Sequence, residues 1–153
     1  MNHELYFHEA LVEAQKAMCE RRKCGSVVVS AKGEVIGRGW NGPPAGDESQ
    51  RRCDRKAELH PDFKSDKTCC PHAEWRAIFE ALRNVPEKIV GSTLYFAACD
   101  EKGEHVFAGE PYCTICSKMA LDVGIMWFGL WHEEGILLYD TREYNDLSFA
   151  WKP

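Results

Sequence analysis

Apolar residues in the first part of the chain follow a helical period. Between residues 5 and 18 they recur at spacings of three and four, as on one face of an amphipathic helix: Phe7, Leu11, Ala14 and Met18. Residues 26–30 and 34–40 are two further apolar segments, and residues 31–33 (AKG) between them are typical of a turn. We therefore expect a helix followed by a β-hairpin.

A long polar stretch follows the hairpin. Residues 41–46 (NGPPAG) cannot continue a strand, and residues 47–68 are almost all polar or charged and show no period. A loop of this length in a compact domain is usually functional, or is held in place by something other than side-chain packing.

The second half of the chain alternates between helical and extended patterns. Residues 73–85 place four apolar side chains on one helical face, and Pro86 ends this helix: Trp75, Ile78, Phe79 and Leu82. The later segments predict strands at 93–98, 125–131 and 136–139, and helices at 113–123 and 143–149. In a chain of 153 residues, this alternation predicts one α/β domain over 1–153. Its helices and strands should form a three-layer α/β/α arrangement around a mixed sheet of four or five strands.

Charge and cysteine content narrow the class of protein. A net charge of -5 argues against a broad basic face for nucleic acid, although the cluster Arg51, Arg52, Arg55 and Lys56 could contact one phosphate or form a solvated loop face. The chain shows no export signal and no long apolar run, so we expect a soluble, cytoplasmic protein that does not cross a membrane. In that compartment its eight cysteines indicate metal binding more than a disulfide framework.

Two short motifs can share one metal ion. His72 and Glu74 lie two residues apart at the predicted start of one helix, and Cys113 and Cys116 lie at the start of another. Helix starts favour the thiolate form of cysteine, and the spacing of three turns both thiols to one side. Two thiolates and one imidazole make a three-ligand zinc site with an open fourth position, as in catalytic zinc sites.

Glu74 gives such a site its chemistry. A carboxylate beside an open zinc site can accept a proton from the attacking water and deliver it to a departing group. Each half of the pattern is weak alone, because His72-Ala73-Glu74 could be an ordinary polar helix start. A further alternative is a structural zinc module for protein contacts, in which Cys69 or Cys70 closes the fourth position.

The combined motif identifies a resemblance. His-x-Glu paired with Pro-Cys-x-x-Cys is the known signature of zinc-dependent nucleobase deaminases, and residues 19–131 resemble the cytidine and deoxycytidylate deaminase superfamily. Residues 24–29 (CGSVVV) and 39–46 (GWNGPPAG) are similar to the deoxycytidylate deaminase branch. The resemblance implies a five-stranded mixed sheet between helices, conversion of dCMP to dUMP and ammonia, and assembly into a homo-oligomer. Another amino-heterocycle, such as a nucleoside, a free base, a purine or a pteridine, is the alternative substrate.

The resemblance also implies roles for individual residues. Asn41 would contact the sugar or phosphate of the substrate, and Ala73 would lie against the pyrimidine. Some similar deoxycytidylate deaminases hold a second, structural zinc at positions that match Cys19, Cys53 and Cys70. A fourth ligand would come from Cys24, His60 or Cys69.

The sequence departs from the family pattern in two places. Tyr112 separates Pro111 from Cys113, whereas the family usually has proline directly before the first cysteine, so the loop entering this helix must differ. After the last long strand, residues 131–134 (WHEE) replace a stretch that tends to carry tyrosine. We expect this stretch to border the pocket, where its two carboxylates would repel a phosphate.

Overall fold

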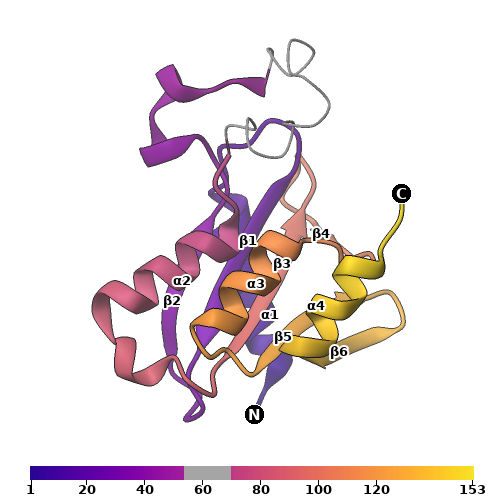
Figure 1. Cartoon of the computed structure of the whole chain (residues 1–153). Coiled ribbons are helices and arrows are strands. Elements are labelled where there is room, and N and C mark those ends of the chain that lie inside the picture. Colours follow the sequence, from indigo (N-terminus) through magenta and orange to yellow (C-terminus); the bar gives the residue numbers. More distant parts are fainter. Residues whose placement is uncertain (54–69) are drawn as a thin grey trace.

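A computed structural model of the protein, in which residues 1–53 and 70–153 are described, contains one mixed sheet with helices on both faces (Figure 1). The strands run in the order β2-β1-β3-β5-β6, and β3 and β5 are the parallel pair. Their bounds are β1 Lys23–Val29, β2 Val35–Trp40, β3 Thr93–Cys99, β4 His105–Val106, β5 Trp127–His132 and β6 Gly135–Asp140. Five strands form the main path, as predicted, and the two-residue β4 pairs with β3 beside it.

The helices complete the predicted three layers. Their bounds are α1 His3–Gln15, α2 Ala73–Asn84, α3 Thr114–Asp122 and α4 Thr141–Ala150. Helix α1 covers one face of the sheet, and α2, α3 and α4 cover the other (Figure 1). Single 3-10 turns occupy Pro44–Gly46, Glu48–Gln50 and Pro86–Lys88. Among the described residues, no helix has the length and apolar character needed to cross a membrane.

Strand β1 has a core on each side. Val27 and Val29 pack in one cluster with Phe7 of α1, while Val28 between them belongs to the cluster on the opposite face of the sheet. The alternation follows from the pleat, because successive side chains of a strand point to opposite faces. Since both faces are covered, β1 is an uninterrupted apolar run at these positions.

Glycines allow the helices to lie very close to the sheet. A Cβ atom on Gly37 or Gly39 of β2 would come within 2.0 or 2.3 Å of backbone oxygens of Ala77 or Ala73 in α2. A Cβ on Gly25 of β1 would likewise come within 2.1 Å of the Ala10 oxygen in α1. Any side chain at these positions would push the helix away.

This close approach corrects the predicted orientation of α2. The side chains that face the sheet are the small ones together with Ile78, because only they fit over the glycines: Ala73, Ala77 and Ala81. Phe79 and Leu82, which were expected in the core, are 40% and 41% exposed. The orientation matters for function, since it turns the start of α2 toward the site described next.

Candidate active site

The candidate ligands lie at the starts of two helices on the same face of the sheet. His72 is the N-cap residue of α2, and Glu74 lies in its first turn. Cys113 is the N-cap residue of α3, where its Sγ accepts a hydrogen bond from the backbone N–H of Cys116 at 3.4 Å. Both helices therefore direct their positive ends at one point, which favours anionic ligands there.

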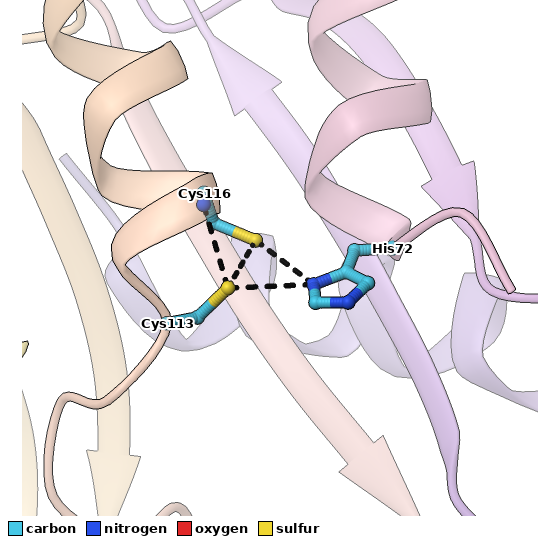
Figure 2. A group of neighbouring side chains, drawn as sticks. All are labelled: His72, Cys113 and Cys116. Atoms are coloured by element: carbon cyan, nitrogen blue, oxygen red, sulfur yellow. Dashed lines mark hydrogen bonds between the residues drawn. The ribbon is translucent and has the colours of Figure 1, made fainter. Parts of the chain in front are cut away.

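The structure brings the three predicted ligands together. The His72 Nδ1 atom lies 3.1 Å from Cys116 Sγ and 3.4 Å from Cys113 Sγ, and the two sulfurs are 2.9 Å apart. Figure 2 shows the imidazole of His72 pointing at both thiols from the neighbouring helix. Within residues 1–53 and 70–153, this is the group of donor atoms close enough to hold a metal ion.

The chemistry of this donor set fits zinc. Hydrogen bonds from the Cys116 thiol and from His72 hold the pKa of Cys113 at about 5, so this sulfur is a thiolate at neutral pH. Burial raises the pKa of the fully buried Cys116, and a metal cation would offset that cost by pairing with its thiolate. One nitrogen and two sulfurs leave a tetrahedral ion one open position.

Glu74 is buried beside these ligands. Its side chain is 6% exposed, and burial raises the pKa of its carboxyl group, with the negative charge of Cys113 acting in the same direction. A carboxyl group with a raised pKa can both accept and release a proton near neutral pH. This is the property that acid–base catalysis requires of Glu74.

A residue that sequence reasoning assigned to the core also belongs to the site. The Trp75 indole stacks on the His72 imidazole, with ring centroids 4.7 Å apart and planes 13° apart. This contact restricts rotation of the imidazole, so it helps to keep Nδ1 directed at the two sulfurs. The signal in the sequence was only the adjacency of Trp75 to the His-x-Glu motif, and helical periodicity favoured a packing role.

The site opens into a cavity of about 450 Å³, which is the size range of small-molecule pockets. His72, Ala73 and Glu74 line it, and so does Asn41. Other lining residues were not predicted, because they approach only through tertiary structure: Arg21, Arg22, Phe96, Tyr112 and Tyr144. Arg52, from the predicted basic cluster, also lines the cavity.

Asn41 connects two segments at the cavity wall. Its amide nitrogen donates a hydrogen bond to the Arg22 carbonyl at 2.7 Å, and its side-chain oxygen accepts one from the Cys24 backbone N–H at 2.9 Å. The side chain is 8% exposed. Asn41 therefore fixes the backbone that leads into β1, and one N–H and one lone pair of its amide are left for a ligand.

The residues predicted for a second zinc lie near the site. Cys19, Cys53 and Cys70 all line the same cavity. Among the described residues, their sulfurs are not close enough to one another to count as such a group. Burial raises the pKa of Cys24, a proposed fourth ligand, to about 12. The other two candidates, His60 and Cys69, lie outside the described residues.

The prediction for residues 131–134 is wrong. Trp131 and His132 end β5, and Glu133 and Glu134 form the exposed turn between β5 and β6. None of these four described residues lines the cavity, so the two carboxylates give no argument against a phosphate there. The two strands were predicted, at 125–131 and 136–139, but the sequence did not show that the turn between them lies away from the cavity.

The chain is similar to known proteins of one family. Residues 1–128 match the cytidine and deoxycytidylate deaminase zinc-binding region. The deoxycytidylate deaminase of Mycobacterium phage D29 is 34% identical over 128 residues, which is 80% of this chain and 88% of the phage protein.

Two solved structures are similar to this one. A crystal structure of the dCMP deaminase of cyanophage S-TIM5 in complex with dCMP and dUMP is 26% identical, with a TM-score of 0.56, and the match covers 82% of this chain and 76% of that chain. Cytidine deaminase from Burkholderia pseudomallei shares the fold at 17% identity, with a TM-score of 0.62 over 94% of this chain and 96% of that one. The sequence and the fold of the present chain together show that it belongs to the cytidine and deoxycytidylate deaminase family.

Proposed function

We propose that the chain is a zinc-dependent hydrolase that deaminates a cytosine-containing nucleotide, and that its favoured reaction converts dCMP and water to dUMP and ammonia. The observation that carries the proposal is the buried Glu74 beside an open set of one imidazole and two thiols, on a cavity of nucleotide size. The similar proteins from phage D29 and cyanophage S-TIM5 support the choice of nucleotide.

Three side chains would hold the metal: His72 through Nδ1, and Cys113 and Cys116 through their sulfurs. Bound there, zinc would supply a Lewis acid that makes water a nucleophile near neutral pH. The parallel stacking of Trp75 on His72 keeps the imidazole in the orientation that ligation needs.

Glu74 moves the protons of the reaction. Its carboxylate accepts a proton from the attacking water and delivers it to the ring nitrogen next to the amino-bearing carbon. The second proton of the water then passes through Glu74 to the amino group, which leaves as ammonia, and a carbonyl remains. Burial suits Glu74 to both tasks, because it raises the pKa of the carboxyl group and so makes it a better proton acceptor.

Ala73 and Asn41 would bind the substrate. Ala73 is fully buried and lines the cavity with a single methyl group, so a flat pyrimidine can lie against it. Asn41 would contact the sugar or the phosphate through the part of its amide that the Arg22 and Cys24 backbones leave available.

A substrate panel tests the proposal. Ammonia release would be measured with dCMP, CMP, deoxycytidine, cytosine, a purine nucleotide and an aminopteridine. We expect dCMP to give the highest kcat/KM. A higher value for the purine or the pteridine would favour the alternative of another amino-heterocycle.

Complete inactivity on the whole panel would favour the structural zinc module. Against that module, the described metal-binding group holds three ligands and does not include Cys70, so nothing in the described part of the chain closes the fourth position. A closed structural site would also leave the buried Glu74 without a role.

A second zinc held by Cys19, Cys53 and Cys70 is also proposed. It is supported by the presence of all three cysteines on the wall of one cavity. Ligation would require their sulfurs to converge further, and the metal itself would provide the free energy for that rearrangement. The zinc content of the purified protein tests the proposal, because two ions per chain are expected, and the Cys53→Ser variant should retain one.

We propose one deaminase domain over 1–153, a cytoplasmic location that keeps the ligating thiols reduced, and a homo-oligomer. Trp127 and Trp151 are 38% and 41% exposed and are available to an interface, whereas Phe128 is fully buried in the core and is not. Light scattering of the purified protein measures the oligomeric state.

A further inference from the structure

A cationic side chain lines the cavity and has no carboxylate partner within residues 1–53 and 70–153. Arg22 precedes β1, and in the described part of the chain it forms no ion pair with a carboxylate. Its guanidinium lies over the Phe96 ring, 5.7 Å from the centroid, and its Nη1 atom is 3.5 Å from the Tyr112 hydroxyl. A half-buried guanidinium that lies over one ring and beside one hydroxyl, and has no carboxylate partner among the described residues, is suited to an anion that comes from outside the protein.

Tyr112 is the second member of this arrangement. It is the residue inserted between Pro111 and Cys113, and like Arg22 it lines the cavity. Its hydroxyl can donate a hydrogen bond to the same anion that Arg22 binds. The two polar groups therefore meet on the cavity wall although they are 90 residues apart in the sequence.

Trp151 fixes the Tyr112 ring from outside. It directly follows α4, and its ring packs on Tyr112 with centroids 5.6 Å apart and planes 47° apart. Tyr112 is 48% exposed, so without this contact its side chain would have solvent on one whole side. Helix α4 is itself tied to α3 by a 2.7 Å hydrogen bond from the Ser117 hydroxyl to the Asn145 side-chain oxygen.

The backbone of Arg22 is fixed as well. The Asn41 amide donates a hydrogen bond to the Arg22 carbonyl, so the guanidinium starts from a defined position at the cavity. Pre-organised groups of this kind lose little conformational entropy when a ligand arrives.

We propose that Arg22 and Tyr112 bind the phosphate of the nucleotide, and that Trp151 is a positioning residue that holds Tyr112 in place for this contact. The proposal rests on the proposed function, because it assumes that the cytosine ring lies against Ala73 and Glu74. It makes these side chains the part of the cavity that distinguishes a nucleotide from a nucleoside.

The other charges of the cavity are compatible with a phosphate. Arg21 and Arg52 also line it, whereas its carboxylates are Glu74, at the ligand cluster, and Glu110. Arg52 is held by its own loop, since its Nη1 donates to the carbonyls of Ser49 and Arg51 at 2.7 and 2.9 Å. Among the described residues that line the cavity, the three guanidinium groups would attract a phosphate dianion.

The test compares dCMP with deoxycytidine in variants of the full-length, zinc-loaded protein. For Arg22→Gln we expect kcat/KM for dCMP to fall by about 10- to 100-fold, the usual value of a hydrogen bond to a charged group. For Tyr112→Phe, which keeps the ring, the expected fall is about 2- to 10-fold. In both variants the fall in kcat/KM should come from a higher KM for dCMP, while zinc content and kcat/KM for deoxycytidine stay the same.

Trp151→Ala should lower kcat/KM for dCMP by as much as Tyr112→Phe does, and Trp151→Phe should keep most of the kcat/KM of the unmodified protein. Two matched controls lie outside the cavity lining and should leave both substrates unaffected: Phe149→Ala, which removes an exposed aromatic ring of α4, and Arg83→Gln, which removes an exposed guanidinium of α2. A rise in KM for the nucleotide alone is a result that a purely structural role of Trp151 would not produce.

Two results would overturn the inference while leaving the proposed function intact. One is a loss of equal size on both substrates in Arg22→Gln, and the other is an unchanged kcat/KM for dCMP in that variant. If the unmodified protein deaminates neither substrate, the proposed function has failed, and calorimetric titration with dUMP and deoxyuridine then decides the inference alone. Tighter binding of dUMP that is lost in Arg22→Gln supports it, and equal binding of the two ligands refutes it.

Discussion

The surroundings of each glutamate in this protein decide what its carboxylate can do. Glu74 is enclosed beside two cysteines, and burial raises the pKa of its carboxyl group. Glu34 lies at the surface, where a 2.8 Å hydrogen bond from Lys88 lowers the pKa of its carboxyl group. Burial thus makes Glu74 the stronger base of the two, and only Glu74 lies at the cavity, so the chemistry follows from the position of Glu74 and not from its residue type.

Replacing Glu74 by glutamine isolates its proton transfer. The amide has nearly the shape of the carboxyl group but cannot accept and return a proton, so we expect kcat for dCMP to fall by about 100- to 10,000-fold. Zinc content, measured by mass spectrometry, should stay the same. Glu104→Gln at an exposed position between β3 and β4 serves as the control. Full activity of Glu74→Gln would refute the mechanism.

At the scale of the elements, the local sequence was sufficient to predict which segments form helices and strands. It was not sufficient to predict which face of a helix packs on the sheet. Strand β2 and the starts of α2 and α3 were predicted within one residue, because turn residues, Pro86 and the apolar period act locally, whereas β1 begins three residues before the predicted strand. The face of α2 was mispredicted, because Gly37 and Gly39 on another element determine which side chains fit against the sheet. The apolar period of a helix depends only on the residues of that helix. It therefore cannot show that a strand far away in the sequence has glycines, which leave room only for small side chains.

The same limit applies to the candidate site. His72, Glu74, Cys113 and Cys116 could be predicted because each pair lies within one turn of a helix and has a spacing that metal chemistry requires. Arg22 could not, because it approaches Tyr112 only through the sheet, and its own neighbours in the sequence are ordinary polar residues.

A methyl group on Gly39 tests the close packing of α2. Gly39→Ala would place its Cβ 2.3 Å from the Ala73 oxygen and 2.5 Å from the Ala77 nitrogen, and neither backbone atom can move without the helix. We expect the free energy of unfolding to fall by about 1 to 3 kcal/mol, the usual cost of overpacking. Activity should fall as well, because α2 carries His72 and Glu74.

Urea denaturation followed by circular dichroism measures this loss. Gly109→Ala is the matched control for stability, because a Cβ at Gly109 would have no atom within 4 Å. If Gly39→Ala were as stable as that control, the close approach would not be what orients the helix.

At the scale of the whole molecule, the topology of the sheet gathers the site at one edge. Lys23 at the start of β1 pairs with Cys99 at the end of β3, and Trp40 at the end of β2 pairs with Gly25. The segments holding Arg22 and Asn41 therefore lie at the edge where β3 ends. The starts of α2 and α3 meet at the same cavity, so described residues that are far apart in the sequence line it together, including Tyr144 of α4.

A metal ion at this edge would join α2 to α3, so its removal should destabilise the whole fold. A ligand present at about 100 times its Kd stabilises a protein by about 2.7 kcal/mol. For a chain of this size that corresponds to a fall in Tm of about 5 to 11 °C when a chelator removes the ion. Differential scanning calorimetry with and without chelator measures this change.

The Cys116→Ser variant separates the contributions of the two proposed ions. It lacks one ligand of the catalytic site, so any remaining response to the chelator reports the second zinc at Cys19, Cys53 and Cys70. Cys99→Ser is the control, because Cys99 is a buried thiol of β3 outside the metal-binding group, and it should respond as the unmodified protein does. An unmodified protein that loses zinc to the chelator and keeps its Tm would show that the ion does not link the two helices. In that case the folded chain alone would hold His72, Cys113 and Cys116 in position.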